Sequence, residues 1–276
     1  MSLARAYYEL KFESEYLRSR GNTFQELFAM LMGKAYKTDF MACRPWGRTG
    51  DQKNDGFLKS EQQLFQVYAP DEMDAKTAIK KISEDFSGAL QHWGKLFNKW
   101  AFVHNANNGL PPHVQRFILE FEQAHPAIKI EVWGLEKLKE VFRKLSLDDL
   151  TSWFGSAPRE ETRIGFADLQ HILKFVATKD IPVDIPVKEV PPDKIKANDL
   201  SESVSILLKA GMQKTIIVDD FFKRWADETL GGRVATAFRE KYRQLRKEVF
   251  IPNAIFAEMQ QWAGGSGSAT PEHQLA

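Results

Sequence analysis

Residues 62–69 constrain the fold most, because they form a strand-like segment that is apolar on both faces. Side chains alternate along a strand, so Gln66 and Tyr68 share one face with Leu64. The other face carries Phe65, Val67 and Ala69. Gln66 and Tyr68 therefore place two polar groups on an otherwise apolar strand, and both are candidates for a functional site.

The order of segments around this strand predicts an α/β fold. Helical periodicity is expected at residues 22–36, 71–83, 84–98, 113–125 and 135–145, and strand patterns at 39–46, 62–69, 99–105 and 128–133. A short apolar segment before residue 62 supplies another strand. The order helix, three strands, helix, strand, helix, strand, helix is typical of a mixed sheet with helices on its faces.

The predicted N-terminal helices include a residue, Glu26, whose role has two interpretations. Residues 4–19 suit a surface helix or a dimer arm, and Gly21 ends this helix. Thr23 and Glu26 then form a capping-box pattern before an apolar run. Glu26 has two interpretations, as the residue that returns a hydrogen bond to the cap and as support for a metal or catalytic site.

The chain changes character after residue 155. Residues 161–178 have helical spacing, and the proline-rich segment DIPVDIPVKEVPPDK follows as a linker or strap. Helices are expected at 200–211, 215–230 and 234–249, with a last one ending at Trp262, although residues 216–222 could start as a strand. We expect a first domain at 1–155, a mainly helical domain at 156–264 and a flexible tail at 265–276.

Composition limits the protein class. A net charge of +1, with 43% hydrophobic and 27% charged residues, describes an ordinary globular protein. Cys43 is the only cysteine, which excludes an intrachain disulfide and a cysteine zinc cluster. No apolar run approaches the roughly 20 residues of a membrane helix. These features predict a cytoplasmic protein without a membrane partner.

Charged residues gather just before the central strand, at Asp51, Lys53 and Asp55. Lys53 and Asp55 would point to one side if the chain is extended there, and such an arrangement can hold a divalent cation. The alternative for Asp55 is structural, because Asn-Asp-Gly at 54–56 is also typical of a tight hairpin turn.

Asp55 followed by Gln66-Val67-Tyr68 resembles the PD-(D/E)XK nuclease signature, and with Glu26 on the preceding helix it is similar to the Mrr-like, restriction-endonuclease-like branch. The strings GNTFQELF, RPWG, GDQKNDG, LFQVYAP and WAFVHN also resemble the endonuclease-like component of bacterial ABC-type three-component defence systems. The resemblance covers residues 21–145. It implies a DNA endonuclease dependent on Mg²⁺ or Mn²⁺, with DNA and protein partners of a defence complex.

The resemblance also implies residue roles. Asp55 would be the main metal ligand, Gln66 would offer its carbonyl oxygen, and Glu26 would bind through water. Tyr68 stands where the motif usually has lysine. Lys53 would then supply the ammonium that stabilises phosphate charge, and Tyr68 would orient water.

Tyr68 also motivates an alternative function, a catalytically weak or inactive nuclease-like module that binds DNA or protein. In either case the helical domain would dock partner subunits. The sequence does not decide between a monomer and a homodimer. A transcriptional regulator is a third class, supported only by the basic residues of 233–247, whose interleaved Glu240 and Glu248 favour a solvated helix face.

His104 ends a strand and has two interpretations, as a general base and as a cap of the following turn. No serine or cysteine nucleophile motif accompanies it, which favours the cap. P-loop, Rossmann and G-x-S-x-G patterns do not occur in the sequence.

Overall fold

The computed structural model describes residues 1–43, 52–107, 109–157, 169–170, 173, 198–248 and 251–263. The chain divides into two compact units. We call Glu15–Leu145 the sheet unit, and Met1–Ser14 together with Ser146–Ala276 the helical unit. The expected domain limits at residues 155 and 264 stay predictions.

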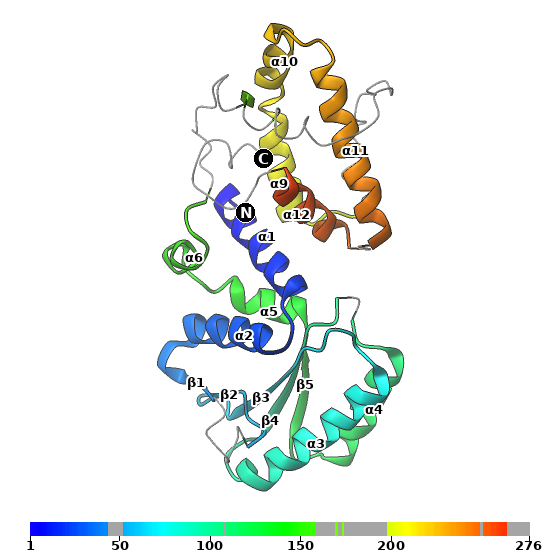
Figure 1. The fold of residues 1–276 in the computed structure, drawn as a ribbon. Coiled ribbons are helices and arrows are strands. Elements are labelled where there is room, and N and C mark those ends of the chain that lie inside the picture. Colours follow the sequence, from blue (N-terminus) through cyan, green and yellow to red (C-terminus); the bar gives the residue numbers. More distant parts are fainter. Residues whose placement is uncertain are drawn as a thin grey trace. The chain divides into compact units, whose positions relative to one another are not determined.

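Five strands form one mixed sheet in the order β1-β2-β3-β4-β5 (Figure 1). They are β1 (Phe40–Ala42), β2 (Gly56–Leu58), β3 (Gln63–Tyr68), β4 (Lys99–His104) and β5 (Lys129–Trp133). The first two pairings are antiparallel, and β3 pairs with β4, and β4 with β5, in parallel. The central strand β3 therefore has hydrogen-bonded neighbours on both edges.

Helices cover both faces of this sheet (Figure 1). One side carries α2 (Gly21–Tyr36) and α5 (Leu135–Phe142), and the other carries α3 (Ala75–Trp93) and α4 (Pro112–Ala124). The single-turn 3-10 helix η1 (Lys37–Asp39) leads into β1. The predicted α/β class and the predicted order of elements are both confirmed.

Two local predictions about helices are wrong. Residues 75–93 form one helix, α3, where two were expected. Helix α2 begins at Gly21, before the predicted cap at Thr23, and no side chain caps it. The reason is tertiary, because the Gly21 N–H donates to the Ala69 carbonyl (2.6 Å) and the positive φ of Gly21 (47°) turns the chain directly into the helix.

The face of the sheet towards α3 and α4 carries the larger apolar core. Leu64, Trp100 and Phe102 pack there against buried residues of α3. The ring centroids of Phe86 and Trp100 lie 5.4 Å apart in an edge-to-face contact. These contacts bury the apolar stripe of α3.

The opposite face packs through an aromatic cluster around Phe65. Its ring lies 5.3 Å from that of Phe28 on α2 and 4.9 Å from that of Trp133 on β5. Phe65 and Trp133 are on strands separated by β4, where Ala101 pairs with Phe65. The small side chain of Ala101 leaves room for the aromatic contact across β4.

The first helix is α1 (Leu3–Arg18), and the expectation of a surface helix is wrong. Its aromatic side chains Tyr8, Phe12 and Tyr16 are buried. In the helical unit, the Tyr8 hydroxyl donates to the Gly155 carbonyl (2.8 Å) beside α6 (Leu147–Phe154). Helix α6 was not predicted from the sequence, although Ser146 and Asp149 form a capping box at its start.

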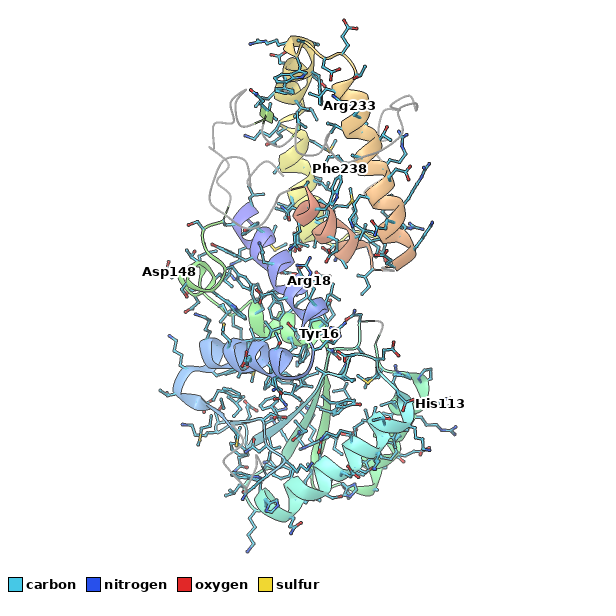
Figure 2. All side chains as sticks on the ribbon, viewed as in Figure 1. Tyr16, Arg18, His113, Asp148, Arg233 and Phe238 are labelled. Carbon is cyan, nitrogen blue, oxygen red and sulfur yellow. The ribbon has the colours of Figure 1, made fainter. Side chains whose placement is uncertain are left out.

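The helical unit also contains α9 (Glu202–Met212), α10 (Thr215–Arg224), α11 (Leu230–Glu248) and α12 (Pro252–Trp262). The mainly helical C-terminal region is confirmed, and the segment that could have started as a strand is α10. Phe238 of α11, labelled in Figure 2, packs edge-to-face on Trp262. None of the described helices is long and apolar enough to span a membrane. The proline-rich segment and the expected tail lie outside the described residues.

The close packing around Ala101 leads to a stability prediction. Ala101→Leu should lower the free energy of unfolding by about 1–3 kcal/mol, because the added side chain must displace the Phe65 and Trp133 rings. Chemical denaturation measures the change. The matched control Ala124→Leu, at an exposed position of α4, should change stability by less than about 0.5 kcal/mol. Equal effects of the two variants would contradict this account.

Candidate functional site

Asp55 is held beside the central strand by both its backbone and its carboxylate. Its N–H donates to the Phe65 carbonyl (2.9 Å), and its own carbonyl accepts from the Cys43 N–H (3.3 Å). Oδ2 accepts from the Val67 N–H (2.7 Å), and Oδ1 accepts from Nε2 of Gln25 on α2 (3.2 Å). Asp55 thus continues the strand pairing of β2 and is not the tip of a tight hairpin turn.

Gln66 directly precedes Val67 on β3 and is 3% exposed. By strand alternation it shares the α3 side with Leu64. Its Oε1 and the Oδ1 of the equally buried Asn54 have no hydrogen-bond partner in the described part of the chain. A buried acceptor without a partner costs about 1–3 kcal/mol, so two of them, in the residues that directly precede Asp55 and Val67, need an explanation.

The position of Lys53 agrees with the prediction from the sequence in one respect and differs in another. Gln52 and Lys53 have positive φ values (52° and 62°), so the chain is not extended there. The expectation that Lys53 and Asp55 point to one side depended on an extended chain. The Lys53 ammonium instead lies 2.9 Å from Oδ1 of Asp85 on α3. Lys53 thereby reaches the α3 side of the sheet, the face that also carries Gln66 and Tyr68.

Tyr68 ends β3 and is partly buried against the core on the α3 side, with its ring 5.9 Å from that of Phe102. Burial raises the pKa of the Tyr68 phenol, and the negative charges of Asp74 and Asp85 raise it further. The phenol therefore stays protonated at neutral pH. It can donate a hydrogen bond, but it cannot replace the positive charge of a lysine.

Glu26 is not part of the Asp55 contacts. Its side chain is exposed on α2, and the preceding residue, Gln25, is the one that contacts Asp55. Asp51 lies outside the described residues. Within the described ranges, no group of three or more His, Cys, Asp or Glu side chains is placed to hold a metal ion.

Three residues of this region were not predicted from the sequence: Gln25, Asn54 and Asp85. Asp85 had a readable signal, because Ala78, Ile82, Asp85 and Ala89 are spaced as one helix face and the aspartate interrupts its apolar side chains. Gln25 and Asn54 had none, since nothing local separates them from ordinary helix and turn residues.

His104 caps the turn after β4, which confirms the interpretation that the sequence favoured. The Ala106 N–H donates to its Nδ1 (3.1 Å), and the Tyr16 hydroxyl, labelled in Figure 2, donates to its carbonyl (2.9 Å). Burial lowers the pKa of His104 to about 4. The ring is therefore neutral at physiological pH and serves the structure of the strand end.

The basic segment at 233–247 lies on α11. Arg233, labelled in Figure 2, pairs with Asp227, and Arg243 lies 2.6 Å from Glu240. These ion pairs agree with the solvated helix face that the sequence favoured over a phosphate site.

A scan against family models relates the C-terminal part of the chain to known proteins. Residues 166–276 match the model for C-terminal domain 10 of the ABC-three component (ABC-3C) systems. This part is therefore similar to a domain of ABC-3C defence systems, in agreement with the resemblance seen in the sequence. The match does not extend to the sheet unit. Searches of curated proteins and of solved structures found no match.

The buried His104 leads to a prediction about pH. Its folded pKa of about 4 lies below the ordinary value of 6.5, so the folded state binds fewer protons than the unfolded state between these values. The stability that neutral His104 contributes is complete above pH 6.5 and is lost as the pH falls to 4, by about 3 kcal/mol.

Denaturation of the wild type and of His104→Asn between pH 7 and pH 4 measures this loss. Asparagine can still accept from the Ala106 N–H but does not titrate, so the variant should lose less stability on acidification. His113→Asn, at an exposed position labelled in Figure 2, should follow the wild type. A pH dependence unchanged in His104→Asn would refute the assignment.

Proposed function

We propose that the sheet unit is a divalent-metal-dependent DNA endonuclease and that the chain is a component of an ABC-3C defence system. The observation that carries the proposal is the Asp55 carboxylate, which is bound to the backbone of β3 beside a buried Gln66 whose amide oxygen has no partner in the described structure. The family match supports the defence system, and a multi-component system implies protein partners. The helical unit, which contains the matched segment, would dock them.

The available donors fit a hard cation. Asp55 offers a carboxylate, and Gln66 and Asn54 each offer a buried amide oxygen, the ligand types that Mg²⁺ and Mn²⁺ accept. Gln25 and the Val67 N–H hold the carboxylate in place before any cation binds. Glu26, being exposed, would act only through water. A bound cation would polarise the scissile phosphate and make water more nucleophilic.

Two residues on the α3 side would assist at the phosphate. Lys53 would stabilise the negative charge that develops in the transition state, since its ammonium is anchored on Asp85. Tyr68, kept protonated by its raised pKa, would donate a hydrogen bond that orients water or a phosphate oxygen.

A second candidate function is a nuclease-like module that binds DNA or protein without cutting. Tyr68 favours it, because a neutral phenol occupies the motif position that usually carries a positive charge. An amide at Gln66 also brings less charge to a cation than glutamate would. The metal and cleavage experiments below separate the two candidates.

Metal binding can be measured apart from activity. With Mn²⁺ at about 100 times its Kd, the wild type should gain about 2.7 kcal/mol of stability, seen as a rise in Tm. Asp55→Asn keeps an acceptor for the Val67 N–H but removes the charge, so it should lose this gain. Gln66→Met should lose it too, yet melt no lower than the wild type without metal, because a buried acceptor has been removed.

The control for the Asp55 variant is Asp148→Asn, at an exposed position of α6 labelled in Figure 2, which should keep the full Mn²⁺ effect. If Mn²⁺ does not raise the Tm of the folded wild type, or raises that of Asp55→Asn equally, Asp55 is not the ligand and the proposed metal site fails.

The roles of Lys53 and Tyr68 can be compared by DNA cleavage with Mg²⁺ or Mn²⁺. Lys53→Met keeps most of the side-chain volume and removes the charge, so cleavage should fall about 100-fold or more. Tyr68→Phe removes one hydroxyl and should cost less. The assignment would be reversed if Tyr68→Phe were inactive and Lys53→Met normal. If the folded wild type never cuts DNA, alone or with its partners, the endonuclease proposal fails and the non-catalytic module is the function that stands.

A further inference from the structure

Asp85 is a fully buried carboxylate that contacts two lysines. It lies on α3 with no exposed surface, and its Oδ1 is 2.9 Å from Nζ of Lys53 and 3.0 Å from Nζ of Lys81. Its Oδ2 has no hydrogen-bond partner among the described residues. Two ammonium groups are thus brought together on a single carboxylate oxygen.

This cluster carries more positive than negative charge. Two lysines and one aspartate sum to +1, and the side chains of Lys53 and Lys81 are 38% and 34% exposed while Asp85 is not exposed. The negative charge is therefore inside, and the positive charges reach the surface. The Lys81 ammonium carries three N–H donors and directs one of them to Asp85, so it can also donate to an anion from solvent.

We infer that Lys53 and Lys81, held together by Asp85, bind a backbone phosphate of duplex DNA. The choice of DNA rests on the proposed function. Lysine ammonium groups are strong ligands for phosphate oxygens, and such contacts position a nucleic acid without reading its sequence. Asp85 is the positioning residue, because it touches the lysines and not the DNA.

Several features of the fold prepare the Lys53 side chain for this role. Its stem lies against Gly88, where a β-carbon would come within 2.6 Å of the Lys53 Cγ. The Trp93 indole N–H donates to the carbonyl of Gln52 (3.1 Å), which ties the preceding residue to the same helix. Helix α3 thus supplies Lys81, Asp85, the gap at Gly88 and the anchor at Trp93.

The cluster lies on the side of the sheet that carries Gln66 and Tyr68. The apolar face of α3 packs on Leu64 of β3, and Asp85 belongs to the buried side of α3. Asp85 is also one of the charges that raise the pKa of Tyr68. A phosphate on the two lysines would therefore bind on the same face as the proposed cleavage residues.

The experiment measures binding of a labelled 20-base-pair DNA duplex to the full chain in EDTA, so that cleavage plays no part. Lys81→Met should weaken binding about tenfold at low salt and reduce the slope of log K against log salt by about 1, as expected for one lost phosphate contact. The matched control is Lys80→Met. Lys80 is the neighbouring residue of α3, is 75% exposed and lies 3.7 Å from Glu84; its loss should change affinity less than twofold.

Asp85→Asn tests the positioning role. This variant adds one unit of positive charge, so charge alone predicts tighter binding, whereas loss of the shared anchor predicts weaker binding. We expect binding at least threefold weaker in protein shown to be folded by circular dichroism. Tighter binding by folded Asp85→Asn would overturn the positioning role, and if the variant does not fold, Lys81→Met against Lys80→Met decides the proposal.

Competition by inorganic phosphate distinguishes a site for DNA from a site for free phosphate. At equal ionic strength, 10 mM phosphate should compete with the duplex no better than chloride does if the polynucleotide is the ligand. Strong competition, or equal binding by Lys81→Met and Lys80→Met, would overturn the inference. Its failure is distinct from failure of the proposed function, because the Mn²⁺ melting measurement on Asp55→Asn and the cleavage measurement on Tyr68→Phe do not involve Lys81.

Discussion

The pairing of β3 with both of its neighbours is the constraint on which the rest of the sheet unit depends. Antiparallel β2 and parallel β4 pair with the two edges of β3, and the side chains of β3 are buried on both of its faces. Helices must then cover each face, and the sheet separates the two cores. Asp55 directly precedes β2, and its carboxylate accepts the hydrogen bond from the Val67 N–H of β3. A charged side chain therefore takes part in a hydrogen bond that holds the sheet together.

The same region concentrates features that cost stability. Gln52 and Lys53 adopt left-handed backbone conformations, and Asn54, Gln66 and Asp85 each bury an oxygen without a hydrogen-bond partner among the described residues. Features of this kind persist when surrounding structure imposes them, and they tend to cluster at functional sites. Several such features coincide within one short stretch and its contacts with α3, so a site is proposed here. At His104, by contrast, the ring nitrogen Nδ1 accepts from the Ala106 N–H.

The two units are linked to function by different observations. The family match lies within the helical unit and supports an ABC-3C system, while the chemistry proposed for the sheet unit rests on its own residues. Much of the sheet unit could be predicted, because apolar periodicity is a local property that each helix and strand carries in its own residues. The site was harder to predict, since Gln25, Asn54 and Asp85 acquire their positions only from contacts with distant segments.

The sequence by itself determined the order of helices and strands in the sheet unit and the placement of Gln66 and Tyr68 on one face of β3, because alternation and periodicity fix which way neighbouring side chains point. For His104 it favoured the turn cap over a general base, and the structure then confirmed the cap. Only the tertiary structure decided that α2 begins at Gly21, that Gln25 and not Glu26 meets Asp55, and that Lys53 turns to Asp85. Those outcomes depend on backbone dihedral angles and on hydrogen bonds between residues far apart in the chain. The Gly21 N–H reaches Ala69 and the Trp93 indole reaches Gln52, and no local pattern encodes either contact.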